Sequence, residues 1–113
     1  MKFSTAQHGK VTVVALQGNL MGGPDAASLN ARINELVDAK KTRVVIDLTG
    51  VQFMNSSGLG LLIGGAQALK TAGGGLKLAC ASPKIRELLA ITRLAPVLEN
   101  HTTVAEAVAA FGT

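Results

Sequence analysis

The feature that most constrains the fold is a step from strand to helix near the middle of the chain. Residues 44–46 are three successive β-branched residues, which favours a strand buried on both faces, as in the middle of a helix-covered sheet. A short polar connection follows. Two serines, Ser56 and Ser57, then precede a segment of helical spacing that extends to about Ala72. The sequence therefore predicts a strand, a loop and a helix that begins near Ser57.

The rest of the chain repeats this alternation. Strands are predicted for residues 2–7, 11–16 and 76–79, and a short apolar segment at residues 96–99 is predicted as an edge strand. Other helix starts are predicted at residues 22–25, at Ser82 with Pro83, and at Thr103 with Glu106. Strands that alternate with helices imply an α/β fold, with a small mixed, largely parallel sheet packed with about four helices.

Composition narrows the class of protein. With 113 residues, of which 48% are apolar, one domain spanning residues 1–113 is expected, and the three aromatic residues leave its core aliphatic. No apolar run approaches the roughly 20 residues that cross a bilayer, the amino terminus lacks the apolar stretch of a secretory signal, and the one cysteine forms no internal disulfide. We therefore expect a cytoplasmic protein that does not bind a membrane.

The net charge of +4 comes partly from two loose basic groups, residues 40–43 and residues 84–93. Neither group has a recognisable nucleic-acid motif or interleaved aromatic residues, so we expect no nucleic-acid partner. Cations near helix ends on a solvated surface are the simpler interpretation.

The two serines at the predicted helix start permit two interpretations. The first backbone N–H groups of a helix have no partner within it, and the positive end of the helix dipole lies there. A serine hydroxyl at this place caps the helix, and a phosphoryl group there is stabilised. The pattern alone therefore indicates either a capping serine or a serine switch, rather than an active site.

Two motifs resemble one family. Residues 47–49 read Asp-Leu-Thr, and residues 53–59 read Phe-Met-Asn-Ser-Ser-Gly-Leu. Together with the glycines at 73–75 and the segment 82–85, they resemble the STAS domain of bacterial anti-sigma factor antagonists, over about residues 11–111. In that family the second serine is the phosphorylation site. The resemblance therefore implies a STAS-like fold and phosphorylation of Ser57, with Ser56 as the neighbouring cap or a minor site.

The resemblance also implies a function and a partner. The unphosphorylated protein would bind an anti-sigma factor serine kinase and so release a sigma factor, and phosphorylation would weaken that binding. ATP would belong to the kinase, so no cofactor, metal or catalytic residue is expected here. Gly58 is expected to let the partner approach the hydroxyl, and Asp47 to support the serine loop. The predicted contact residues are Asn19, Met21, Asn55, Ser56, Ser57, Gly58 and Leu61.

Two departures from the family pattern keep an alternative open. The family usually has Asp where this chain has Asn55, and acids where it has Asn19 and Met21. These changes favour a STAS scaffold or transporter-accessory subunit without phosphorylation. An enzyme with serine chemistry is a third class, for which the nucleophile-elbow pattern fails because Met54 replaces its first glycine. The oligomeric state is expected to be a monomer or a weak homodimer.

Overall fold

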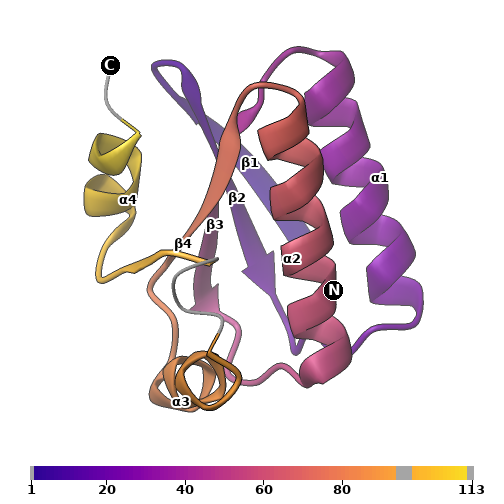
Figure 1. The fold of residues 1–113 in the computed structure, drawn as a ribbon, viewed down its shortest axis with the longest axis vertical. Helices are drawn as coiled ribbons and strands as arrows, with labels where there is room; N and C mark the ends of the chain where they lie inside the picture. The colour runs from indigo at the N-terminus through magenta and orange to yellow at the C-terminus, as the bar shows by residue number, and fades with distance from the viewer. Residues whose placement is uncertain (1, 94–97, 112–113) are drawn as a thin grey trace.

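The computed structural model describes residues 2–93 and 98–111, and within them five strands form one sheet in the order β1-β2-β3-β4-β5 (Figure 1). The hairpin of β1 (Lys2–His8) and β2 (Val11–Gln17) is antiparallel. β3 (Arg43–Gly50), β4 (Gly75–Ala79) and β5 (Asn100–His101) extend the sheet in parallel. The predicted mixed, largely parallel sheet is confirmed.

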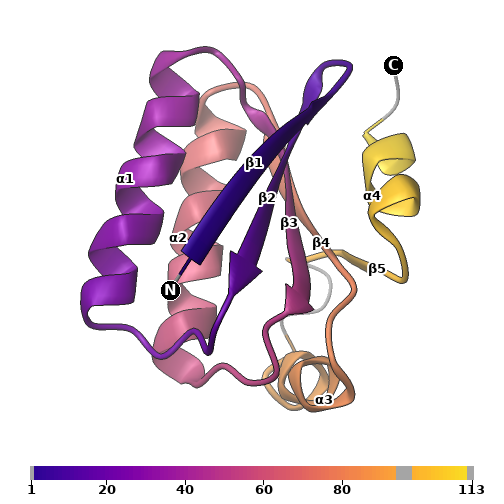
Figure 2. The same cartoon turned by 180° about the vertical axis from the view of Figure 1, so that it is seen from behind.

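Helices cover both faces of this sheet. α1 (Pro24–Asp38) and α2 (Ser56–Thr71) lie side by side on one face, and α4 (Val104–Ala110) lies on the other (Figures 1 and 2). α3 (Pro83–Ile91) lies at the edge where β3 and β4 end. None of the helices in the described residues combines the length and hydrophobicity of a bilayer-spanning segment.

The two faces create two cores that share the central strand. Val44, Ile46 and Leu48 of β3 point into the larger core beneath α1, α2 and α3, whereas Val45 points into the smaller core beneath α4. Residues 44–46 are all 0% exposed, so the predicted strand buried on both faces is confirmed. Burying each such side chain contributes about 1.5–3 kcal/mol relative to leaving it in water.

Most predicted element boundaries hold because they rest on local hydrogen bonds. The Ser82 hydroxyl accepts a hydrogen bond from the Ile85 N–H (3.3 Å), and the Thr103 hydroxyl accepts one from the Glu106 N–H (3.1 Å). The predicted edge strand is displaced. Residues 96–97 lie outside the described residues, and strand pairing begins only at Asn100, opposite Leu78.

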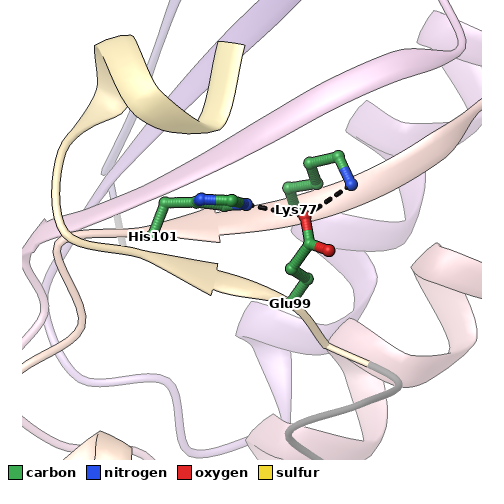
Figure 3. A network of polar contacts seen from close by, with 3 residues as sticks. All are labelled: Lys77, Glu99 and His101. Carbon is green, nitrogen blue, oxygen red and sulfur yellow. Dashed lines mark hydrogen bonds and ion pairs between the residues drawn. The ribbon is translucent and has the colours of Figure 1, made fainter. Parts of the chain in front are cut away.

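A cluster of three polar side chains links the short strand β5 to its neighbour β4. One carboxylate oxygen of Glu99 lies 2.6 Å from Lys77 Nζ and 2.6 Å from His101 Nε2 (Figure 3). These two hydrogen bonds lower the pKa of Glu99 below its ordinary value of 4.5. Lys77 Nζ also lies 5.0 Å from the centre of the Phe111 ring, so the same lysine contacts the residue that follows α4.

Candidate functional site

Two connections meet at the edge of the sheet where β2 and β3 end. The Leu20 N–H donates to the Phe53 carbonyl oxygen (3.2 Å), and the Asn55 N–H donates to the Leu20 carbonyl oxygen (3.3 Å). Leu20 and Met54 form a parallel bridge and are both buried. These backbone contacts hold the β2–α1 connection against the β3–α2 connection, and we call residues 18–23 and 50–58 together the serine edge.

Asn55 caps α2 and ties the two connections together. Its Oδ1 accepts a hydrogen bond from the Gly58 N–H (2.9 Å), and its Nδ2 donates to the Met21 carbonyl oxygen (3.2 Å). The expectation that Ser56 caps the helix is therefore wrong, because the helix begins one residue earlier than predicted and Asn55 occupies the cap position. A carboxylate at position 55 would keep the cap but has no N–H to donate to Met21.

Ser56 and Ser57 are the first two residues of α2, and both are exposed. At this position their backbone N–H groups have no partner within the helix, and the positive end of the helix dipole faces them. The first turn of α2 contains no acidic residue. A negative group on Ser57 would therefore be attracted by the helix end without meeting a carboxylate in that turn.

Gly22 is a site residue that the sequence did not identify. A Cβ at this position would lie 3.2 Å from Ser57 Cβ, so Gly22 is the immediate neighbour of Ser57 from the other connection. Its φ of +88° is one that side chains of L-residues rarely adopt. The consecutive glycines at 22 and 23 indicated an interruption of regular secondary structure, but no local pattern indicated that this segment lies against Ser57.

The expectation that Gly58 leaves room for a partner is wrong. Gly58 is buried, and a Cβ there would collide with the carbonyl oxygen of Leu20 in the same chain. The missing side chain therefore allows the start of α2 to approach the β2–α1 connection. The space that a side chain of Gly58 would fill is occupied by Leu20 of the same chain and is not open to a partner.

The surface of the serine edge carries no charged side chain. Its sequence has no Asp, Glu, Lys, Arg or His, and two large apolar side chains are exposed on it, Met21 (45%) and Phe53 (42%). Asn19 is also exposed, as expected for a contact residue. Leu61 is only partly exposed because it packs against the larger core. Phe53 was absent from the predicted contact residues.

Asp47 supports the chain just before this edge. Its Oδ1 accepts hydrogen bonds from the backbone N–H (3.0 Å) and the hydroxyl (2.6 Å) of Thr49. These contacts shape the end of β3, which is the local supporting role predicted for Asp47.

The remaining reactive side chains lie away from Ser57. The ring of His101, on β5, contacts the carboxylate of Glu99, the residue that precedes this strand. Cys80 is partly exposed and follows directly after β4, with a positive φ of +61°. In residues 2–93 and 98–111, no three His, Cys, Asp or Glu side chains gather as metal ligands would.

Comparison with known proteins agrees with this architecture. The family described as the STAS domain matches residues 2–107. The curated “Putative anti-sigma factor antagonist BtrV” of Bordetella bronchiseptica is 28% identical over 113 residues, which cover 100% of this chain and 97% of that protein.

Two solved structures share the fold at 25% sequence identity. An anti-sigma factor antagonist from Mycobacterium paratuberculosis has a TM-score of 0.82, with 99% of this chain and 94% of that chain covered. The Bacillus cell fate determinant SpoIIAA in its phosphorylated form has a TM-score of 0.71, with 95% and 96% covered. With a family match over nearly the whole chain and a sheet and helix arrangement that agrees, this chain belongs to the STAS domain family.

Proposed function

We propose that this chain is a regulatory binding protein, an anti-sigma factor antagonist that docks on an anti-sigma serine kinase and is released by phosphorylation of Ser57. The observation that carries the proposal is the position of Ser57. It is exposed at the second residue of α2, next to Gly22, on an edge without charged side chains. The names of the relatives BtrV and SpoIIAA support the class of function, and the existence of a phosphorylated form of SpoIIAA supports the switch.

The proposed docking surface combines apolar anchors with the serine. Met21 and Phe53 are large and exposed, Phe53 in the connection that precedes Ser57 in sequence and Met21 in the connection that lies beside it in space. Exposed aromatic and Met side chains are enriched at protein interfaces, whereas charged groups are depleted at interface centres. The contact residues proposed here are therefore Asn19, Met21, Phe53, Asn55, Ser56 and Ser57, with the exposed part of Leu61.

The energetics explain why a phosphoryl group would act on binding rather than on the fold. Its interaction with the helix end stabilises the isolated chain by only about 0.3–1 kcal/mol. A group with a charge of about −1.5 to −2 is costly to desolvate inside an uncharged interface. Inverting a 99:1 binding preference takes about 5.5 kcal/mol of differential affinity, which a phosphate at the centre of a contact can supply.

The experiment is a pull-down from native lysate with Ser57→Ala and Ser57→Asp as baits, followed by identification of the captured proteins by mass spectrometry. We expect a serine-kinase domain to be retained by Ser57→Ala and lost with Ser57→Asp. The matched control is Asn34→Asp, which places the same charge on an exposed residue in the second half of α1, toward the end of the helix opposite the serine edge. That control should bind as well as the natural chain.

The alternative of a scaffold without a switch gives a different result. In that case Ser57→Asp binds its partner as well as Ser57→Ala, and protein isolated from its native cells carries no phosphate on Ser57 in any growth state. An enzyme with serine chemistry would instead show turnover that Ser57→Ala abolishes. Either outcome would overturn the proposed switch.

A further inference from the structure

A second candidate site lies at the opposite end of the molecule from Ser57. Four cations gather there from three segments: Lys10 lies in the β1–β2 turn, Lys40 and Lys41 follow α1, and Arg43 begins β3. They line a hollow of about 380 Å³ together with Gln7, Thr42 and Gly73. The hairpin and the ends of α1 and α2 share this edge at the top of Figures 1 and 2. We call Lys10, Lys40, Lys41 and Arg43 the basic edge.

The turns that carry these residues are held together by the backbone. The Gly75 N–H donates to the Thr42 carbonyl oxygen (2.9 Å), and a Cβ on Gly74 would collide with that same oxygen. The α2–β4 turn therefore lies directly against the α1–β3 turn. This close approach fixes the backbone positions of Lys41 and Arg43, on either side of Thr42, so the cations are presented by a preorganised frame.

The charge at this edge exceeds what the fold itself requires. α1 and α2 both end here, and each helix end carries about half a negative charge. The two helix ends supply about one negative charge, and Asp38, the last residue of α1, supplies another, so the four cations leave about two positive charges. No carboxylate is among the described residues that line the hollow. Helix-end complementarity and Asp38 together offset about two of these cations.

One further observation singles out Lys40. It adopts a positive φ of +60° at the turn that ends α1, a conformation in which glycine is usual. The corresponding position after α2 is Gly73, with a φ of +97°. The backbone of Lys40 is therefore strained, and its side chain adds a cation to the lining of the hollow.

We propose that the basic edge binds a phosphate-type anion with more than one negative charge. Lysine and arginine side chains form charge-assisted hydrogen bonds to phosphate oxygens, and the hollow lies within the volume range of small-ligand sites. This site is separate from the serine edge, so its occupation does not depend on the proposed switch. Such a group comes either from a free oligophosphate or from a phosphate-monoester lipid headgroup.

The test is an NMR titration of the isotope-labelled full chain with pyrophosphate, at about 50 mM and about 300 mM salt. We expect amide shifts at Lys10, residues 40–43 and Gly73, with Ser57 unaffected, and weaker binding at the higher salt. Vesicles of phosphatidylcholine with and without phosphatidic acid form the second arm. Binding to pyrophosphate identifies a free phosphate source, and binding only to vesicles with phosphatidic acid identifies a lipid source.

Matched variants separate a site from net charge. Lys10→Glu with Lys41→Glu should weaken pyrophosphate or vesicle binding by about tenfold or more, because it reverses two of the four cations. Lys84→Glu with Arg86→Glu changes the net charge equally in the second basic group and should change binding by less than about twofold. If the first pair disturbs the spectrum of the folded chain, Lys10→Gln with Lys41→Gln replaces it. An equal loss of affinity in the two double variants, or no binding of either probe to the natural chain, would overturn the proposal.

Discussion

The serine edge and the basic edge are opposite ends of one sheet, and they carry opposite electrostatic preferences. α1 and α2 begin at the serine edge, where the chain has no charged side chain in residues 18–23 and 50–58. Both helices end at the basic edge, where four cations line one hollow. Because α1 and α2 each connect neighbouring parallel strands across the same face, they run in the same direction, so their positive dipole ends lie at one edge and their negative ends at the other.

The two edges nevertheless use one packing device. At each edge a glycine sits where a second connection crosses it, Gly58 against the Leu20 carbonyl and Gly74 against the Thr42 carbonyl. At each edge a backbone N–H also joins the two connections. The backbone contacts are therefore similar at both edges, whereas the side chains that these edges carry differ.

Adding a methyl group at Gly58 or Gly74 should destabilise the fold, because it separates the two connections that touch at that edge. Gly58→Ala and Gly74→Ala each force a Cβ against a backbone oxygen that has no side-chain freedom to move away, so each should lower the free energy of unfolding by about 3 kcal/mol or more. Urea denaturation measures both. Gly60→Ala, in the same helix as Gly58 with nothing within 4 Å, should instead stabilise by up to about 1 kcal/mol. Tolerance of Gly58→Ala would contradict the described crossing.

The cap of α2 gives the next largest effect. Asn55→Ala removes the acceptor for the Gly58 N–H and the donor to the Met21 carbonyl, so it should destabilise by about 1–2 kcal/mol and speed amide exchange in residues 19–22. Ser56→Ala should change stability by no more than about 0.5 kcal/mol. A larger loss with Ser56→Ala than with Asn55→Ala would return the capping role to the serine.

The two helix ends at the basic edge allow a smaller, paired test. After α1 the N–H groups of Lys40 and Lys41 donate to Val37 and Leu36, and after α2 the N–H groups of Gly73 and Gly74 donate in the same pattern to Lys70 and Leu69. Gly73→Ala should therefore destabilise by about 1 kcal/mol, whereas Lys40→Gly should stabilise by about 0.5 kcal/mol. Thermal unfolding at high salt, which screens the change in charge, measures the pair.

The smallest effect concerns the charged contact of Glu99 with Lys77 and His101, which belongs to neither edge. Hydrogen bonds from Lys77 and His101 lower the pKa of Glu99 in the folded chain. A lowered folded-state pKa contributes stability above the unfolded value of about 4.5, and that contribution is lost as the pH falls through the folded value. Because Glu99 is half-exposed, the contribution should stay below about 1 kcal/mol. Stability curves of Glu99→Gln and the natural chain should therefore differ near neutral pH and converge in acid.

The sequence was sufficient wherever a structure depends on residues close together in the chain. Hydrophobic spacing predicted the β-α alternation, and Ser82 and Thr103 predicted helix starts, because a cap is a hydrogen bond across three residues. The same reasoning chose the wrong cap for α2. Both Asn55 and the serines are good capping residues, and in the structure Asn55 is the cap and also donates a hydrogen bond to Met21, a residue 34 positions away.

What only the tertiary structure decided is which connections touch. No local pattern places Gly22 beside Ser57, turns Gly58 toward Leu20, or brings Lys10 to the turn that follows α1. The sequence by itself determined the elements, their order and the exposed serine at a helix start. Contacts between distant connections depend on how strands align in the sheet, and that alignment is set by packing of the whole core rather than by neighbours along the chain.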